Sequence, residues 1–272
     1  MKLKEALREV LTPEERGLLV GSFDVVGSVA IIIVPVLLEA KENLIAAAIL
    51  RLHRNIRTVA KRVGNYEGEF RTLSLKVIGG EGLGETVHRE NGVRFLLNPE
   101  KVYFSVRSSH ERQRIAALIG PGEEILVMFS GIGAFPLILA AGSRAGEIVG
   151  IEKNPDAHRY ALKSLAANRR IKNVVLLAGD VRDVLPRLQR TFDRVLMPLP
   201  GSAGRYLDLA LTVCRRGGWL HFYDFQPPDT FPESVAAIKV GCGNRPVTDT
   251  HTAVCGHCSP RRYRICVDAR IG

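Results

Sequence analysis

Residues 126–135 read LVMFSGIGAF, an apolar run that breaks into Ser-Gly-Ile-Gly before a helical stretch. A strand, a short loop with two glycines and a helix form the first crossover of a nucleotide-binding sheet, in which backbone N–H groups and a helix N-terminus face the ligand. Gly131 and Gly133 allow the backbone to come close to that ligand. This stretch therefore predicts an α/β nucleotide-binding fold.

Downstream of this loop, apolar runs alternate with amphipathic stretches. Strands separated by helices of this length indicate right-handed crossovers and a mostly parallel sheet that is covered on both faces. The last strand follows a long insertion, so an antiparallel direction stays open for it. The expected strands are residues 123–129, 147–152, 173–179, 192–200, 217–225 and 261–271, and the expected helices are residues 134–142, 155–170 and 201–216.

Upstream of residue 126 the pattern is different. Residues 20–36 resemble strand, residues 42–63 contain a helix, and short strands joined by Gly and Asn turns follow between residues 73 and 99. We therefore expect two domains, a small α+β domain at residues 1–97 and a larger α/β domain at residues 98–272.

The composition is that of an ordinary soluble protein, with 46% hydrophobic and 24% charged residues among 272. The chain has no apolar run of the roughly 18 residues that a membrane span needs, and its N-terminus lacks the apolar core of a signal peptide. We expect a cytoplasmic protein that does not bind membranes. The net charge of +10 favours a polyanion such as nucleic acid as partner, although it is also compatible with simple solubility.

The five cysteines do not form a disulfide pattern. Cys255 and Cys258 form a CxxC that could bind zinc together with nearby Cys and His residues. Cys266 lies in an alternating strand pattern, however, and there is no second CxxC. We therefore predict no metal ion. The other residues of the zinc alternative are Cys242, His251 and His257.

Polar residues at the ends of successive strands indicate the ligand. Pro136 stands where a dinucleotide fingerprint has its third glycine, which argues against a bound pyrophosphate. Glu152 ends the second strand and could hold both ribose hydroxyls, and Asp180 follows the third and could reach an adenine amino group. This set suits S-adenosylmethionine better than NAD. The alternative is that both acids only cap helices or loops.

A longer motif gives a more specific indication. Residues 97–115, LNPEKVYFSVRSSHERQRI, together with FDRVLMPLPGSA at residues 192–203 and GSFDVVGSVAI at residues 21–31, resemble the archaeal and eukaryotic-type tRNA (guanine-37-N1) methyltransferases, close to the wybutosine aminocarboxypropyltransferase branch. The resemblance runs from Ser22 to the end. It implies a class I, Rossmann-like methyltransferase domain with a seven-stranded sheet, S-adenosylmethionine as cofactor and a small domain that assists tRNA binding. Because Ser22 lies near the start, we do not expect the tRNA-elbow domain of many members.

The resemblance also implies roles for individual residues. Glu111 would be the general base that removes the N1 proton of guanine, Arg71 would stabilise charge on O6, and Arg107 would be a third catalytic residue. Arg112 would contact tRNA. The implied cofactor-binding residues are Tyr103, Arg107, Phe129, Ser130, Gly131, Gly133, Glu152, Lys153, Asp180, Val181 and Pro198. The alternatives are a charged helix start, in which Glu111 pairs with Arg107 four residues back, and a surface position for Arg71.

One motif departs from the family. The chain has Pro198-Leu199-Pro200 where the family usually has Asn-Leu-Pro, so a side-chain amide is missing. Methyl transfer remains the first hypothesis, and transfer of the 3-amino-3-carboxypropyl group to a wybutosine precursor is the second. A dual methyltransferase for guanosine and a tricyclic intermediate, and an inactive RNA-binding module, also stay open.

Four basic residues suggest where tRNA binds. Arg51, Arg54, Arg57 and Lys61 recur at three-four spacing on an expected helix at residues 50–62, which predicts one stripe for phosphates. The alternative is a solvated helix face. We expect a monomer that binds the anticodon loop of tRNA and works on a base taken out of its stack.

Overall fold

The computed structural model describes residues 2–259 and 261–272, without the side chains of residues 65 and 66. The chain divides into two compact units. The first consists of Met1–Glu90 and Arg94–Val106, and the second of Asn91–Val93 and Arg107–Gly272. The first unit therefore extends to Val106, beyond the boundary expected at residue 97.

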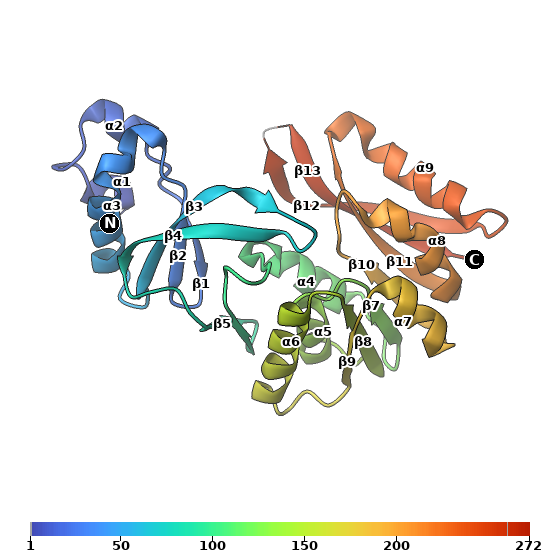
Figure 1. Cartoon of the computed structure of the whole chain (residues 1–272). Helices are drawn as coiled ribbons and strands as arrows, with labels where there is room; N and C mark the ends of the chain where they lie inside the picture. Colours follow the sequence, from blue (N-terminus) through green and yellow to red (C-terminus); the bar gives the residue numbers. More distant parts are fainter. Residues whose placement is uncertain (1, 260) are drawn as a thin grey trace. The chain divides into compact units, whose positions relative to one another are not determined.

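The first unit is a small α+β structure (blue to cyan in Figure 1). Its four-stranded sheet has the order β1-β2-β3-β4, with β2 and β3 parallel and the other pairs antiparallel. Buried leucine and isoleucine side chains from α1, α3 and the sheet make its core. The elements are α1 (Leu3–Ala6), α2 (Pro13–Leu18), β1 (Asp24–Val26), β2 (Val29–Ile32), the 3-10 helix η1 (Val36–Lys41), α3 (Glu42–Leu52), β3 (Thr58–Glu67), β4 (Thr72–Gly80) and the hairpin of β5 (Thr86–Glu90) and β6 (Val93–Leu97).

The helix expected at residues 50–62 is wrong, and with it the basic stripe. Helix α3 ends at Leu52, and β3 begins at Thr58. The β-branched Thr58 and Val59 favour a strand, and their burial in the sheet outweighs the helical spacing of the arginines. Arg51 therefore lies at the end of the helix, Arg54 and Arg57 lie in the link to β3, and Lys61 lies on the strand itself.

The second unit is an α/β sheet of seven strands in the order β12-β13-β11-β10-β7-β8-β9. Strands β7 to β11 run parallel, while β13 pairs antiparallel with both β11 and β12. This settles the direction that the sequence left open for the last strand. The strands are β7 (Glu124–Val127), β8 (Glu147–Glu152), β9 (Val174–Ala178), β10 (Phe192–Met197), β11 (Cys214–Gln226), β12 (Val247–Ser259) and β13 (Arg262–Ile271).

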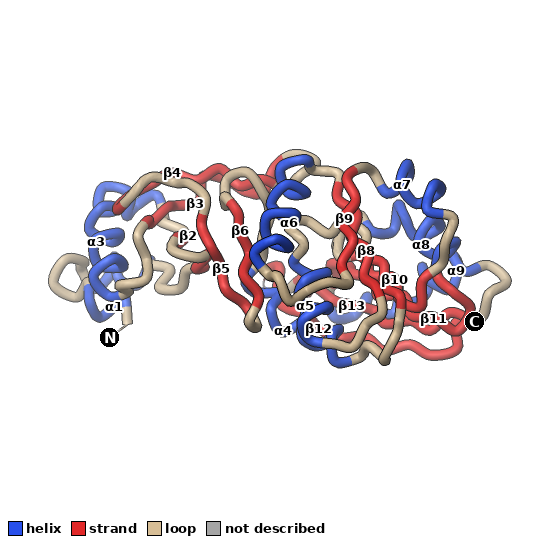
Figure 2. Tube along the Cα trace, turned by 90° about the horizontal axis from the view of Figure 1, so that it is seen from below, coloured by secondary structure: helices blue, strands red, loops and turns tan. Residues whose placement is uncertain are grey.

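Helices cover both faces of this sheet, as expected for buried parallel strands. Helices α4, α5 and α6 lie on one face, and α7, α8 and α9 lie on the other (Figure 1). In Figure 2, β8 and β9 lie between α6 and α7. The helical elements are η2 (Val106–Ser108), α4 (Ser109–Ala117), α5 (Ala134–Gly142), α6 (Pro155–Ala167), α7 (Val181–Leu188), η3 (Ala203–Tyr206), α8 (Leu207–Val213), η4 (Pro228–Thr230) and α9 (Phe231–Cys242).

The core of the second unit lies on both faces of the sheet, because successive side chains along a strand point to opposite faces. Leu126, Val149 and Val195 pack with α7, α8 and α9, while Ile125 and Val127 are equally buried. Since both faces are covered, the central strands read as continuous apolar runs. None of the described helices has the length and apolar character that crossing a membrane requires.

Candidate active site

The glycine loop follows β7 at the carboxyl edge of the sheet. Because β10, β7, β8 and β9 are parallel neighbours, their carboxyl ends all lie along this edge. The backbone N–H of Gly131 donates to Glu152 Oε2 at 2.6 Å, and that of Asn154 donates to Oε1 at 2.7 Å. Burial raises the pKa of Glu152 even though these hydrogen bonds favour its charged form. The loop and the acid at the end of β8 thus form one unit.

The loop has the features of a ligand cradle. Gly131 has a φ of 57°, and a Cβ placed on it would meet no described atom within 4 Å, so there is open space beside the backbone. Gly133 has a φ of 79° and starts α5. Ser130 is 6% exposed, yet its hydroxyl finds no hydrogen-bond partner in the part of the chain that the structure describes. A buried polar atom next to open space fits a polar ligand such as S-adenosylmethionine.

Asp180 lies at the end of β9 and caps α7. Its Oδ1 accepts from the N–H of Arg182 at 2.9 Å, and its Oδ2 lies 3.1 Å from Lys153 Nζ. The Arg182 amide, with help from Lys153, lowers the pKa of Asp180. The capping alternative is therefore realised for this residue, while its place at the sheet edge keeps it beside Glu152. Val181 behind it is buried.

Two further residues of the predicted cofactor set lie at the same edge. Phe129 has a φ of 59° and packs edge-on against Tyr206, with ring centroids 4.9 Å apart. Pro198 follows β10 and is half-buried, and the next residue, Leu199, closes a tight turn by donating its N–H to Met197 O at 2.8 Å. A proline offers no N–H and no side-chain amide here.

Glu111, the predicted base, lies in the first turn of α4 and is 5% exposed. Its arginine partner is Arg114, three residues later, and not Arg107 as the sequence alternative had it. Arg114 donates from Nε to Oε2 and from Nη2 to Oε1, both at 2.8 Å. The hydroxyl of Tyr223 on β11 also donates to Oε1, at 2.7 Å. Burial, together with nearby negative groups such as Glu111, raises the pKa of Tyr223, so this hydroxyl stays a donor.

Behind Glu111 runs a chain of polar groups that are buried or half-buried. Arg114 also donates to Asp268 on β13, from Nη1 to Oδ2 at 2.5 Å and from Nη2 to Oδ1 at 3.1 Å. Asp268 Oδ1 is 2.5 Å from His221 Nδ1, and His221 Nε2 is 2.7 Å from Arg194 Nη1. Arg194 donates to both oxygens of Glu123, at 2.8 and 3.1 Å. We call this chain of residues, from Glu111 through Arg114, Asp268, His221 and Arg194 to Glu123, the Glu111 relay.

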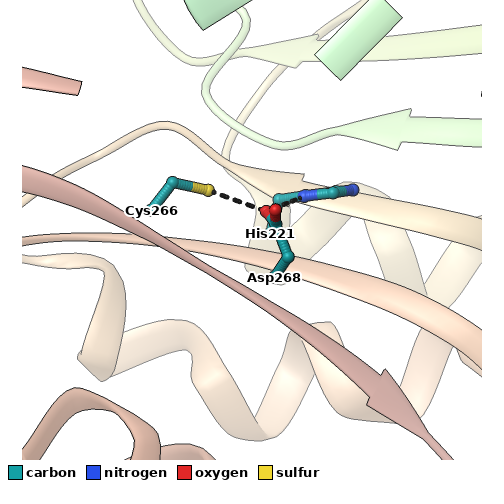
Figure 3. A group of neighbouring side chains, drawn as sticks. All are labelled: His221, Cys266 and Asp268. Carbon is teal, nitrogen blue, oxygen red and sulfur yellow. Dashed lines mark hydrogen bonds and ion pairs between the residues drawn. The ribbon is translucent and has the colours of Figure 1, made fainter. Parts of the chain in front are cut away.

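His221, Cys266 and Asp268 have the donor types of a metal site, and their ligand atoms lie within 4.8 Å of one another (Figure 3). Their contacts argue for a hydrogen-bond network instead. Cys266 Sγ donates to Asp268 Oδ1 at 3.3 Å, both ring nitrogens of His221 are engaged, and an arginine lies at either end of the group. A cation would have to compete with these two guanidinium groups.

The remaining predicted residues lie in different places. Arg71 has a φ of 50° in the turn between β3 and β4, and Tyr103 is exposed in the last part of the first unit. Arg107 is exposed at the start of the second unit. Arg112 is only 3% exposed, so its side chain does not form part of the surface as the predicted tRNA contact would require.

Lys61 is also not available as a surface contact. Its Nζ lies 2.7 Å from Glu39 Oε1 and 2.6 Å from Glu42 Oε2, and hydrogen bonds to these two carboxylates raise the pKa of Lys61. Its basic group is thus neutralised inside the first unit. Arg51, Arg54 and Arg57 are exposed.

Sequence reasoning did not identify the Glu111 relay beyond Glu111 itself. His221 and Tyr223 lie within an apolar strand, and Asp268 interrupts the apolar alternation of another. A charged residue in a strand that is otherwise buried needs a partner, and this signal could have pointed to Asp268. Nothing in the sequence pairs it with Arg114, 154 residues away.

The sheet order, the glycine loop and the acids at the strand ends define a class I methyltransferase of the S-adenosylmethionine-dependent type. Residues 86–247 match the TRM5/TYW2 methyltransferase domain, and residues 3–83 match the TYW2 N-terminal domain. The chain belongs to the TRM5/TYW2 family.

Individual relatives come from both branches of this family. The chain is 35% identical over 270 residues to the tRNA (guanine(37)-N(1))-methyltransferase Trm5b of Pyrococcus abyssi, covering 97% of this chain and 79% of the relative. It is 34% identical over 157 residues to the tRNA(Phe) (4-demethylwyosine(37)-C(7)) aminocarboxypropyltransferase of Methanocaldococcus jannaschii, covering 58% and 61%. The solved complex of aTrm5 and tRNALeu superposes with a TM-score of 0.87 at 28% identity, covering 100% of this chain and 78% of that one.

Proposed function

We propose that the protein is a tRNA (guanine-37-N1)-methyltransferase that uses S-adenosylmethionine. The observation that carries the proposal is the buried Glu111 carboxylate, held in place by Arg114 and Tyr223 within a methyltransferase domain. The similarity to Trm5b over nearly the whole chain supports the same activity.

The glycine loop and its neighbours would hold the donor. Gly131 leaves room for it, the Ser130 hydroxyl lacks a partner among the described residues, and Glu152 would bind the ribose hydroxyls. When bound, S-adenosylmethionine supplies a methyl group on a positively charged sulfur and leaves as a neutral thioether. Asp180 and Phe129 would flank the adenine side of the same edge.

Glu111 would take the proton from guanine N1. Its Oε1 already accepts two hydrogen bonds, from Arg114 and Tyr223, whereas Oε2 accepts one, from Arg114 Nε. A carboxylate oxygen has two lone pairs, so Oε2 is the oxygen left to receive the proton. Negative charge then grows on O6, and we assign its stabilisation to Arg71 and Arg107.

The tRNA would be held by positive charge on the surface. The chain carries a net charge of +10, and a family member was solved as a complex with tRNALeu. Arg51, Arg54 and Arg57 are exposed and remain our candidates for phosphate contacts. The target base would leave the anticodon-loop stack to reach Glu111.

Aminocarboxypropyl transfer is the second candidate, because two observations favour it. Pro198 replaces the usual amide side chain, and residues 3–83 match the N-terminal domain of the TYW2 branch. That reaction would use the same donor but transfer a different group to a wybutosine precursor.

A double-label transfer assay separates the candidates. One reaction contains S-adenosylmethionine labelled in the methyl group, the other donor labelled in the carboxyl group, each with transcripts carrying guanosine 37 and with wybutosine-precursor tRNA. We expect methyl label to enter the guanosine-37 transcript, and Glu111→Gln to lose at least about 100-fold in rate. Glu233→Gln, an exposed glutamate on α9, is the matched control.

Other outcomes overturn the proposal in different ways. Carboxyl label in the precursor tRNA, without methyl label in the guanosine transcript, identifies the second candidate. No label in either reaction, together with no heat of S-adenosylmethionine binding in calorimetry, identifies an inactive RNA-binding module.

A further inference from the structure

A base that is paired with an arginine faces a conflict. A guanidinium in contact with a carboxylate favours the charged form of that carboxylate, and a base paired in this way accepts a proton less readily. The pairing is close, with two donor–acceptor distances of 2.8 Å. If Arg114 served Glu111 alone, it would weaken the base that the reaction needs.

Arg114 does not serve Glu111 alone, however. It donates to Asp268 through Nη1 and Nη2, so one cation lies between two carboxylates and Nη2 is shared by both. Burial opposes the charge on Arg114, but its hydrogen bonds to both acids raise the pKa of Arg114 above the usual value, so it stays charged. The three groups together carry one excess negative charge.

His221 and Arg194, which lie on the side of Asp268 away from Arg114, help to hold Asp268 in its charged form. Arg194 can only donate, so His221 Nε2 is the acceptor and the ring proton lies on Nδ1, from which it donates to Asp268. Burial lowers the pKa of His221, which is consistent with a neutral ring. Burial alone would raise the pKa of Asp268, but the hydrogen bonds from His221 and Arg114 hold it well below its usual range. Asp268 therefore keeps its negative charge opposite Arg114.

We propose that Asp268 is a positioning residue for the base: by sharing Arg114, it lets Glu111 remain fixed in place and still accept the N1 proton. The inference rests on the proposed function. The N1–H bond of guanine breaks, an O–H bond forms at Glu111 Oε2, and Arg114 shifts its charge toward Asp268, which is the only carboxylate of the pair left ionised.

The groups around Glu111 come from four elements of the second unit. Arg114 is on α4 itself, with Arg107, His110 and Arg112 nearby in sequence. Tyr223 is on β11, and Asp268 and the Cys266 thiol are on β13. Cys255 on β12 lies close enough that, after burial, Glu111 is the next cause of the raised pKa of the Cys255 thiol. The two thiols and the Tyr223 phenol thus stay neutral. The charged groups that the variants below remove are Arg114 and Asp268.

The experiment measures single-turnover methyl transfer to guanosine-37 tRNA as a function of pH, with the whole chain. In Asp268→Asn, Arg114 would pair with Glu111 alone. We expect the acid limb of the rate–pH profile to move about 1 unit lower, and the plateau rate to fall about 10-fold or more. Asp249→Asn, an exposed aspartate on the neighbouring β12, is the matched control and should leave both unchanged.

A second variant should move the acid limb of the rate–pH profile in the opposite direction, and it remains informative if Asp268→Asn does not fold. Arg114→Gln removes the shared cation, so the acid limb should move to higher pH. Arg114 is more exposed than Asp268, with side-chain values of 26% and 5%, and is therefore the safer substitution. A merely structural loss lowers the rate without moving the acid limb in opposite directions in the two variants.

The results separate this inference from the proposed function. Suppose that wild type methylates the tRNA and Glu111→Gln does not, while neither Asp268→Asn nor Arg114→Gln moves the acid limb. In that case Asp268 has no role in how readily Glu111 accepts the proton. If wild type methylates no guanosine, the proposed function itself fails. Opposite shifts in the two variants support the sharing of Arg114.

Discussion

His221 is fully buried, and both of its ring nitrogens have partners. Burial lowers the pKa of His221 below its ordinary value of 6.5. Below that pH, the unfolded chain binds a proton that the folded chain refuses, so the free energy of unfolding must fall as the pH falls. We expect a loss of about 1 kcal/mol between pH 6.5 and 5.5 from this residue alone. Below the ordinary Asp value of 3.8, the lowered pKa of Asp268 adds a second loss.

Urea unfolding at pH 7.5, 6.5 and 5.5 tests this dependence. In His221→Asn the side-chain amide can still donate to Asp268 but cannot take up a proton. The free energy of unfolding of this variant should therefore fall less steeply than that of wild type as the pH falls. His251→Asn on the exposed strand β12 is the control. Parallel curves for wild type and His221→Asn would show that the ring does not titrate with folding.

Gly131 offers a second test on the scale of one residue. Its φ of 57° is unfavourable for a residue with a Cβ, and the space beside it is open. Gly131→Ala should cost about 1 kcal/mol in stability from backbone strain, and the new methyl group should also weaken S-adenosylmethionine binding about 10-fold. Gly122→Ala is a matched control, because Gly122 has a φ of 79° and equally open surroundings.

Calorimetric titration with S-adenosylmethionine and thermal unfolding decide the point. Both variants should lose a similar amount of stability, and only Gly131→Ala should lose affinity. Equal affinities in the two variants would remove the glycine loop from the donor site.

The site was predictable from the sequence where its residues occupy fixed places along strands. Gly131, Glu152 and Asp180 follow strands whose apolar pattern is clear, so their position at one edge could be derived. Glu111 could be assigned only by resemblance, since a charged helix start looks the same without tertiary contacts. The pairing of Arg114 with Asp268 depends on the closing of the sheet by β13, which no local pattern encodes.

On the scale of an element, α3 and β3 show how a helical spacing can mislead. The three-four spacing of basic residues continues past Leu52, but Val59 and Ala60 are buried in the sheet and determine a strand. Lys61 then lies inside, between Glu39 and Glu42. Charge spacing on a surface is a weak signal compared with the burial of apolar side chains.

Lys61 is therefore expected to contribute to the stability of the first unit, through its ion pairs with Glu39 and Glu42. Lys61→Met should lower the free energy of unfolding by about 1–3 kcal/mol at pH 7, because two carboxylates lose a cation. Hydrogen bonds to Glu39 and Glu42 raise the pKa of Lys61 above 10.5, so this contribution is complete at pH 7 and is lost only as the pH rises through the folded value.

The matched control is Lys76→Met, because Lys76 pairs with the same Glu42 but has a side chain that is 58% exposed. Exposed ion pairs contribute little, so this variant should lose less than about 1 kcal/mol. Denaturant unfolding measures both. Equal losses would mean that burial of Lys61 adds nothing to its ion pairs.

On the scale of the whole molecule, the series of parallel strands was predictable, and the insertion between β11 and β13 was not. The insertion after β11 forms α9 and β12, and β12 is an edge strand whose side chains are mostly exposed or half-buried. An edge strand of this kind lacks apolar alternation, so its sequence carries no strand signal. β13, by contrast, is buried along most of its length and was expected.

The two units have separate hydrophobic cores, and the residues assigned to the glycine loop, Glu152 and Asp180 all belong to the second unit. A ligand that binds only folded protein stabilises the unit that contains its site. S-adenosylmethionine at about 100 times its dissociation constant should stabilise the second unit by about 2.7 kcal/mol, which corresponds to a rise of about 5–10 °C in its transition. The midpoint temperature of the first unit's unfolding transition should not change.

Differential scanning calorimetry with and without the donor measures both transitions, and Lys61→Met identifies the transition of the first unit by lowering it. Gly131→Ala should reduce the ligand-induced shift without changing which transition responds. A single transition that moves as a whole with the donor would mean that the two units unfold together. Since each unit buries its own apolar side chains, two responses are the expected result.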